Sequence, residues 1–221
     1  MSPDQMILID KPENMTSFGV VARVRRKISE AAGKKVKVGH TGTLDPFATG
    51  LLILMSGKMT KKCQEFLKLD KVYEATIRLG TTSTTGDPEG EITEEKVAKA
   101  PTLEEVEAAV GRFKGEIEQT LPQFSAVKIN GQRAYKLARK GRAVEMPTRK
   151  IMIYSIEILD YAFPVLKIRC HVSSGTYVRT LGEDIGKILG TRAYLTALRR
   201  LKIGNYDVKD AKTLEDFGVV D

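Results

Sequence analysis

Apolar and polar residues alternate along the chain in patterns that predict both strands and helices. The run Met6–Asp10 is typical of a short strand. Thr16 and Ser17 follow with side-chain oxygens that can cap a helix. The apolar residues beyond them recur at helical spacing, and the face that they form is expected to comprise Val20, Val21, Val24 and Ile28. Alternation is strict in Lys71–Gly80, which predicts a half-buried strand with Tyr73 on its apolar side.

The second half of the chain predicts a turn, a capped helix, a hairpin and two closing helices. The turn is expected at Asp87-Pro88-Glu89-Gly90. A capping box at Thr102-Leu103-Glu104-Glu105 opens a helix whose inward residues are expected to be Leu103, Val106, Val110 and Phe113. The hairpin is expected from Ile151–Leu159 and Val165–Val172, with Leu166, Ile168, Cys170 and Val172 facing inward. The closing helices are expected near Tyr177–Leu189 and Arg192–Leu201.

Net charge adds a class of partner to this picture. The chain has 36 Lys and Arg against 28 Asp and Glu, a formal charge of +8, which favours capture of polyanions. One basic segment comprises Arg23, Arg25, Arg26, Lys27, Lys34, Lys35 and Lys37, opposed only by Glu30. A second, Ser125–Lys150, has eight Lys and Arg, one acid and Tyr135. This composition suits phosphate contacts and base stacking. A solvated face is the alternative for the first segment.

Several classes of protein are disfavoured by what the chain contains. The cysteines, Cys63 and Cys170, and the histidines, His40 and His171, have no metal-ligand spacing, so neither a zinc site nor a disulfide framework is expected. The start of the chain has no signal-peptide pattern, and the longest apolar run, Leu51–Met55, is too short to cross a membrane. We therefore expect a cytoplasmic protein without a metal, and no repeat or linker interrupts a single α/β domain spanning residues 1–221.

One glycine-punctuated loop presents a carboxylate. It reads Gly39-His40-Thr41-Gly42-Thr43-Leu44-Asp45-Pro46-Phe47-Ala48-Thr49-Gly50. The glycines allow sharp turns and close approach to a ligand, and Pro46 holds Asp45 extended. Taken alone, an aspartate that bonds its own backbone in a turn is the commoner arrangement.

The whole string resembles the catalytic motif of pseudouridine synthases, and specifically of the TruB family, the tRNA pseudouridine-55 synthases. Further segments resemble family motifs in the same order along the chain: Leu8-Ile9-Asp10-Lys11-Pro12 with Thr16-Ser17, Lys71-Val72-Tyr73 with Leu79-Gly80, Ser125-Ala126-Val127-Lys128 through Gly141, Ser174–Thr180, and Leu198-Arg199-Arg200-Leu201. The chain departs from the family at Asn14, where Gly is usual, and at Leu121-Pro122, where Pro-Pro is usual. The C-terminal PUA domain of larger members is not expected here.

The resemblance implies a mixed, largely antiparallel central sheet flanked by helices, with a basic thumb loop at about residues 124–150. It implies a cofactor-independent isomerase that extrudes uridine 55 from the T loop of tRNA, with Asp45 as nucleophile. Tyr73 would stack on the uracil, and Arg179 would pair with Asp45. RNA-binding roles would fall to His40, Tyr177, Leu198, Lys128, Arg139 and Arg142, and Lys11 would support the loop. The expected partner is the T-loop arm of tRNA, and the expected state is a monomer.

Three questions stay open at this point. Asp45 could attack C1′ of the sugar, take its 2′ proton, or act on the base. Guide-RNA-dependent synthases are a rival within the same chemistry, although Thr41 and Phe47-Ala48-Thr49 favour the bacterial type. An RNA-binding or tRNA-folding module is a rival from another class, against which the presence of Asp45, Tyr73 and Arg179 argues.

Overall fold

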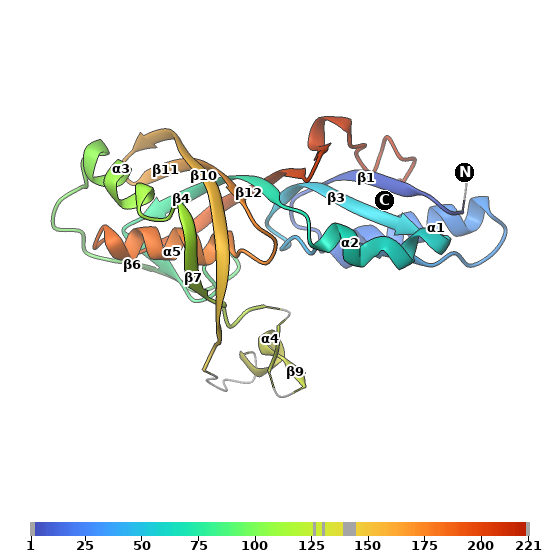
Figure 1. Cartoon of the computed structure of the whole chain (residues 1–221), viewed down its shortest axis with the longest axis horizontal. Helices are drawn as coiled ribbons and strands as arrows, with labels where there is room; N and C mark the ends of the chain where they lie inside the picture. The colour runs from blue at the N-terminus through green and yellow to red at the C-terminus, as the bar shows by residue number, and fades with distance from the viewer. Residues whose placement is uncertain (1–2, 126, 130, 139–144, 220–221) are drawn as a thin grey trace. The chain divides into compact units, whose positions relative to one another are not determined.

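The computed structural model describes residues 3–125, 127–129, 131–138 and 145–219. The chain forms two compact units. Figure 1 shows its helices and strands, coloured from the N-terminus to the C-terminus. Unit 1 comprises Met1–Glu74 and Ala197–Asp221, and unit 2 comprises Ala75–Thr196. Two strands, β4 (Lys71–Leu79) and β12 (Ala193–Ile203), have residues in both units. The expectation of a single domain stays a prediction.

Unit 1 is built around strand β3 (Thr49–Ser56). Strand β1 (Met6–Lys11) pairs antiparallel with β3, from Met6 opposite Met55 to Lys11 opposite Gly50. Strand β2 (Val38–His40) pairs antiparallel with the end of β3, and β12 pairs parallel with its start. Helix α1 (Ser17–Ala31) begins at Thr16, whose Oγ1 accepts a hydrogen bond from the backbone N–H of Gly19, as the sequence predicts. Two short elements, β13 (Tyr206–Asp207) and η2 (Val208–Asp210), follow β12.

The apolar run in β3 is continuous because both faces of the strand are covered. Leu52 and Leu54 pack in a cluster with Ile7 and Ile9 of β1 and with the predicted apolar face of α1, Val20, Val21, Val24 and Ile28. Leu51, Ile53 and Met55 point the other way, into a cluster that includes Met59 and Phe66 of the 3₁₀ helix η1 (Gly57–Lys62) and helix α2 (Cys63–Leu67). A strand buried on both sides has no polar face to alternate with.

Unit 2 is a largely antiparallel sheet with strand order β12-β4-β11-β10-β7. Strand β10 (Thr148–Ala162) pairs antiparallel with β11 (Val165–Val172) and with β7 (Gly115–Thr120). Helix α3 (Leu103–Gly111) contacts β10, and helix α5 (Val178–Ile188) contacts β7. A two-stranded ribbon, β5 (Thr81–Ser83) with β6 (Ile92–Glu94), leads from β4 toward α3. The predicted mixed, largely antiparallel sheet is confirmed.

The predicted thumb lies between β7 and β10, and Figure 1 shows it beyond the ends of these two strands. It contains the ribbon β8 (Lys128–Ile129) with β9 (Gln132–Arg133), and helix α4 (Ala134–Ala138). The two sides of its base are paired, because Thr120 lies opposite Thr148 and the N–H of Leu121 donates to the carbonyl of Pro147 at 3.1 Å. The two chain segments that flank the thumb are therefore hydrogen-bonded to each other.

Two sequence predictions are wrong in their details. Leu103, expected to face inward, is 49% exposed, whereas Val106, Val110 and Phe113 are buried as predicted. A helix was expected near Arg192–Leu201, but residues 193–201 belong to strand β12 (Ala193–Ile203). Ala, Leu and Arg favour helices, but hydrogen bonding to neighbouring strands and burial of alternate side chains outweigh that preference here. The predicted helix near Tyr177–Leu189 is confirmed as α5.

None of the helices in the described part of the chain is long and apolar enough to span a bilayer.

Candidate active site

The predicted catalytic string occupies the connection between β2 and β3 in unit 1. The string leaves β2 at His40, which lies opposite Leu54, and it enters β3 at Thr49. Between these ends the backbone is anchored to neighbouring elements. The N–H of Thr41 donates to the carbonyl of Ile53 at 3.0 Å. The hydroxyl of Ser17, at the start of α1, accepts from the N–H of Leu44 at 2.8 Å and donates to the carbonyl of Leu44 at 2.9 Å.

Two buried cations hold the same loop through its carbonyl groups. Lys11 has no exposed surface, and its ammonium group donates to the carbonyls of Pro12, Met15 and Pro46 at 2.7, 2.6 and 3.0 Å. Arg200 is 1% exposed, and its guanidinium donates to the carbonyls of Leu51, Gly42 and Thr43 at 2.7, 3.1 and 3.4 Å. Buried cations are tolerated when their donors are satisfied. Lys11 thus supports the loop, as the resemblance implies.

Glycine is required where the string joins β3. Gly50 has φ of 101°, a region that residues with a Cβ rarely adopt. A Cβ at this position would lie 2.3 Å from the carbonyl oxygen of Arg200 on β12. The missing side chain therefore lets β12 approach the catalytic loop closely enough for the Arg200 guanidinium to reach it.

Asp45 is half-buried between anchored apolar neighbours. Leu44 and Phe47 are 3% and 5% exposed, and the carbonyl of Asp45 accepts from the N–H of Ala48 at 3.1 Å. The loop is therefore fixed on both sides of the carboxylate. Its neighbours pack in the core, and its backbone forms hydrogen bonds with residues of β1, β3, β12 and α1. Such a loop presents one carboxylate in a defined position, which nucleophilic or general-base chemistry requires.

His40 contributes a neutral imidazole to the start of the loop. Its Nδ1 accepts a hydrogen bond from the N–H of Gly42 at 3.3 Å, which leaves the proton on Nε2. Burial lowers the pKa of His40 below its usual 6.5, and the charge of Arg200 lowers it further. The side chain therefore stays uncharged near neutral pH, consistent with the structural or nucleotide-holding role implied by the resemblance.

The remaining predicted residues of unit 1 are buried. Tyr73 is 8% exposed and lies on the apolar face of β4, as its strand pattern predicts. Leu198 on β12 is 7% exposed. Lys71, two residues before Tyr73, donates to the carbonyls of Leu67 and Leu69, and its burial lowers the pKa to about 8 with a further contribution from Arg200. Lys71 thus joins Lys11 and Arg200 among the buried cations in the described residues of unit 1.

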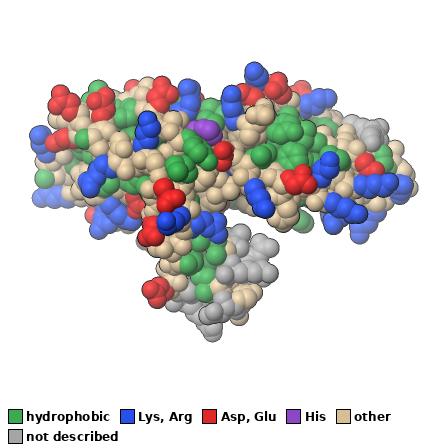
Figure 2. All heavy atoms as spheres, viewed as in Figure 1, with side chains coloured by type: hydrophobic (Ala, Val, Ile, Leu, Met, Phe, Trp, Pro, Cys, Tyr) green, Lys and Arg blue, Asp and Glu red, His purple; other side chains and the backbone are tan. Residues whose placement is uncertain are grey.

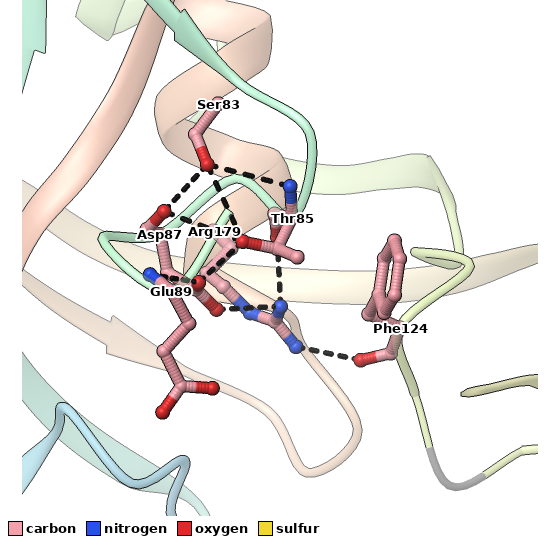
Figure 3. A network of polar contacts seen from close by, with 6 residues as sticks. All are labelled: Ser83, Thr85, Asp87, Glu89, Phe124 and Arg179. Atoms are coloured by element: carbon pink, nitrogen blue, oxygen red, sulfur yellow. Dashed lines mark hydrogen bonds and ion pairs between the residues drawn. The ribbon is translucent and has the colours of Figure 1, made fainter. Parts of the chain in front are cut away.

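Arg179 lies in unit 2, in the first turn of α5, and is 4% exposed. Figure 3 shows its guanidinium between the loop that follows β5 and the residue Phe124 at the base of the thumb. Nη1 donates to the carboxylate of Asp87 at 2.9 Å and to the carbonyl of Thr85 at 2.8 Å, and Nη2 donates to the carbonyl of Phe124 at 2.9 Å. Both terminal nitrogens are therefore oriented by the protein itself.

Asp87 is the buried counter-charge of Arg179. The two side chains are 3% and 5% exposed, so neither charge is solvated. The second carboxylate oxygen of Asp87 accepts from the N–H of Glu89 at 3.1 Å and from the hydroxyl of Thr85. These contacts belong to the turn that the sequence predicts at Asp87–Gly90, where the N–H of Gly90 donates to the carbonyl of Asp87. A buried ion pair of this kind positions its cation because every alternative orientation leaves a charge unpaired.

Gln119 fixes the start of α5. Its side-chain oxygen accepts from the N–H of Tyr177 at 2.8 Å, and its side-chain nitrogen donates to the carbonyl of Tyr177 at 3.0 Å. Gln119 lies in β7 and is 1% exposed, whereas Tyr177 is half-buried at the N-cap of α5 without a capping bond from its own side chain. The amide therefore holds the residue two positions before Arg179.

The sequence did not predict the positioning roles of Asp87, Gln119 and Arg200. Asp87 was predicted only as a turn residue, Gln119 was not singled out, and Arg200 appeared only within a family motif. No local signal marks these roles, because each side chain bonds a segment at least 58 residues away.

The predicted contact between Asp45 and Arg179 and the predicted thumb cations are considered last. Asp45 belongs to unit 1 and Arg179 to unit 2, and their pairing stays a prediction. Arg139 and Arg142 lie outside the described residues, and Lys128 is described only as a member of β8.

Comparisons with known proteins agree with the motifs. Residues 26–178 match the model of the TruB family pseudouridylate synthase N-terminal domain, and residues 179–219 match that of the tRNA pseudouridylate synthase B C-terminal domain. A tRNA pseudouridine synthase B of Phocaeicola vulgatus is 45% identical over 96% of this chain and 91% of its own. That of Cupriavidus pinatubonensis is 44% identical over 95% of this chain and 66% of its own.

Solved structures give the same fold. The crystal structure of a Cbf5-Nop10-Gar1 complex contains a chain with a TM-score of 0.70 and 28% identity, covering 95% of this chain and 52% of the other. A pseudouridylate synthase with 14% identity and a TM-score of 0.50, covering 100% of this chain and 75% of the other, shows likeness of fold only. Matched along nearly its whole length by both domain models and by relatives at up to 45% identity, the chain belongs to the TruB family of pseudouridylate synthases.

Proposed function

We propose that this chain converts uridine 55 in the T loop of tRNA to pseudouridine, with Asp45 as the nucleophile. The observation that carries the proposal is the anchored catalytic string, in which buried Lys11 and Arg200 hold the backbone on either side of Asp45. The relative from Phocaeicola vulgatus, which this chain matches over 91% of the relative's length, is named tRNA pseudouridine synthase B. This name supports tRNA as the substrate.

The reaction is an isomerisation within one nucleoside. The N1–C1′ glycosidic bond breaks, the uracil turns over, and a C5–C1′ bond forms. C5 loses its proton and N1 gains one, so atoms and electrons balance without an oxidant or a second substrate. A carboxylate is suited to such a step because it can trap an electron-poor sugar carbon, as it does in glycoside hydrolysis.

The two units would supply different parts of the chemistry. Asp45 would contribute the nucleophile, and a loop that is already rigid avoids the entropic cost of orienting it during the reaction. Arg179 would pair with Asp45, with its orientation set by Asp87, Thr85 and Phe124. Tyr73 would stack on the extruded uracil and assist in removing the C5 proton.

Each unit has buried hydroxyl groups that are open to a polar ligand close in sequence to its predicted site residue. Among the described residues, Thr41, Ser125 and Thr180 have buried side-chain oxygens without a hydrogen-bond partner. Thr41 lies four positions before Asp45, Ser125 follows Phe124, and Thr180 follows Arg179. Buried polar atoms are normally satisfied, and unsatisfied ones suggest a missing water or ligand.

Extruding the uridine costs roughly a few kcal/mol, which phosphate contacts would offset. The thumb, with Lys128, Arg139 and Arg142, would supply part of that grip, while His40, Tyr177 and Leu198 would contact the extruded nucleotide. The partner is the T-loop arm of tRNA, the protein would act as a monomer in the cytoplasm, and no cofactor is required.

A guide-RNA-dependent role is the rival proposal. One solved neighbour is described as an H/ACA RNP bound to a substrate RNA, and its matched chain is 27% identical to this one. The relatives named tRNA pseudouridine synthase B are 42–45% identical. This difference favours an enzyme that recognises tRNA without a guide.

The proposal is tested by mapping the product. An unmodified tRNA transcript is incubated with the protein alone, and pseudouridine is located by carbodiimide treatment and primer extension. A single stop at position 55 is expected with the wild type, and none with Asp45→Asn. Modification elsewhere, or only after a guide RNA is added, would refute the substrate assignment.

A further inference from the structure

Two lysine-rich segments meet at one end of unit 1. The first is the loop after α1, and the second is η1. They are joined because Val38 of β2 lies opposite Ser56 of β3, and the N–H of Gly57 donates to the carbonyl of Lys37 at 2.8 Å. The six exposed lysines of these segments, here called the lysine surface, are Lys34, Lys35, Lys37, Lys58, Lys61 and Lys62.

The lysine surface keeps an excess of positive charge. Within the part of the chain that the structure describes, none of the six ammonium groups forms a salt bridge. The carboxylate of Asp4 lies beside the surface, where it accepts a hydrogen bond from the backbone N–H of Lys58 at 2.7 Å, so it offsets part of the positive charge. Glu30 on α1 and Glu65 on α2 are the other acids of the adjoining elements. Figure 2 shows Lys and Arg side chains gathered at the end of unit 1 where η1 lies.

Local geometry brings the cations of the two segments close together. In a 3₁₀ helix, residues three apart lie on the same side, so Lys58 and Lys61 project together. Lys37 is close to η1, since its charge acts to lower the pKa of Cys63, although burial of that thiol has the larger, raising effect. Clustered like charges repel one another. The repulsion is relieved when a polyanion binds across the cluster.

The lysine surface adjoins the strand that leads into the catalytic loop. Lys37 directly precedes β2, whose three residues span about 10 Å at 3.3 Å per residue and include the first two residues of the catalytic string. That length is comparable to the Debye length of about 8 Å at physiological salt. On α1, Arg23, Arg25 and Lys27 are half-buried and Arg26 is exposed, and the predicted role of these cations in phosphate contacts stays a prediction.

We propose that the lysine surface binds phosphate groups of the substrate RNA, as a grip in unit 1 that is separate from the thumb in unit 2. The identity of the RNA rests on the proposed function, whereas the binding itself does not. Lysine ammonium groups act as point charges and do not read base edges. The surface therefore contributes affinity and salt dependence, and it takes no part in the chemical step.

The test compares two triple variants with the same change of charge. Lys58→Gln/Lys61→Gln/Lys62→Gln removes half of the lysine surface. Lys96→Gln/Lys99→Gln/Lys114→Gln removes three exposed lysines of unit 2 and serves as the control. Affinity for a fluorescent tRNA transcript is measured by anisotropy over a range of salt concentrations, and single-turnover pseudouridine formation is measured at saturating RNA. Thermal unfolding checks that both variants fold.

The proposal predicts that the first variant binds tRNA about tenfold more weakly, and that its plot of log affinity against log salt is shallower by about two. Its single-turnover rate at saturation should equal that of the wild type, and the control should bind normally. Replacement of the same three residues by Arg should restore affinity.

Equal weakening in both triple variants would reduce the effect to net charge, and wild-type affinity in the first variant would also overturn the proposal. Binding of anionic lipid vesicles by the wild type, with unchanged RNA affinity in the variant, would assign the lysines to a different partner. Because affinity is measured without turnover, loss of the proposed function and loss of this grip give different results.

Discussion

Asn14 stands at a position where Gly is usual in the family. Its backbone φ of 60° lies in the left-handed region. Asn is among the non-glycine residues that tolerate this region best. The replacement of the Gly usual in the family therefore preserves the turn before α1, and the departure noted in the sequence has a physical explanation.

Asp87→Asn tests whether Asp87 is required to hold Arg179. The change leaves a buried guanidinium without its counter-charge, so the free energy of unfolding should fall by about 3–5 kcal/mol. Turnover should fall as well, at a temperature where the variant is folded. Chemical denaturation and a single-turnover assay measure the two effects.

Asp184→Asn is the matched control, because Asp184 forms an exposed ion pair with Lys187 on the same helix. Its effect on stability should stay below about 1 kcal/mol. A wild-type turnover rate for folded Asp87→Asn would show that Arg179 does not depend on this partner.

His40 should couple stability to pH. Its pKa is lowered in the folded protein, so below its usual value of 6.5 the unfolded chain binds a proton that the folded chain does not. The stability contributed by neutral His40 is therefore complete above 6.5 and declines as pH falls below it. Between about pH 7.5 and about pH 5.5, the wild type should lose more stability than His40→Gln.

His171→Gln is the control for this comparison, since His171 is the other histidine and lies on β11, where it contacts the ring of Tyr154. Denaturant titrations at both pH values provide the measurement. Identical losses in wild type and His40→Gln would mean that His40 is not the group responsible.

At the scale of secondary structure elements, α5 positions Arg179 through its N-terminus and its packing. Gln119 holds Tyr177 by two hydrogen bonds. Farther along the helix, Gly186 allows close contact with β12, because a Cβ there would lie 2.6 Å from the backbone nitrogen of Ala193. The start of the helix and the base of the thumb are also joined, since Arg179 bonds the carbonyl of Phe124.

Gln119→Leu should impair chemistry more than RNA binding. The substitution leaves the N–H of Tyr177 without its partner, at a cost of about 1–3 kcal/mol, whereas the carbonyl of Tyr177 keeps the hydrogen bond from the N–H of Leu181. With the start of α5 released, kcat should fall while KM for tRNA changes little. Gln123→Leu, at an exposed position before the thumb, is the control for a nearby loss of an amide. An equal rise in KM with unchanged kcat would place Gln119 in RNA binding instead.

Local signals explain which elements the sequence predicts correctly. The capping oxygens of Thr16 and Thr102 act within three residues, and both are confirmed. The alternation in β4 likewise reports a single sheet face. Strand β12 was predicted wrongly because its composition favours a helix and its pairing partner β3 lies about 150 residues away. Leu103 was placed inward on spacing alone, although it is the first residue of its helix.

Interactions over long sequence distances explain what could not be predicted in the site. The catalytic string, Tyr73 and Arg179 could be proposed from the sequence because they lie in contiguous motifs. The residues that orient them do not, since Asp87 and Arg179 are 92 positions apart and Arg200 reaches Gly42 over 158. Such pairs become visible only when the sheet has brought the segments together.

At the scale of the whole molecule, charge should dominate RNA binding. The chain carries a formal charge of +8, and its thumb segment and lysine surface are rich in cations. Affinity for tRNA should therefore fall by about tenfold or more between about 50 and about 200 mM salt, as counterions released from phosphates are taken back. Anisotropy titrations measure this, with the free energy of unfolding followed over the same range as a control. An affinity independent of salt would contradict a phosphate-based grip.

The account depends most on Asp45 performing the chemistry from a loop that is already in place. The most direct test is the single-turnover rate of pseudouridine formation in Asp45→Asn at saturating tRNA, measured beside its RNA affinity. The expected result is affinity close to that of the wild type and no detectable product, because Ser17, Lys11 and Arg200 hold the loop through its backbone. Product formation at a rate near that of the wild type would contradict it.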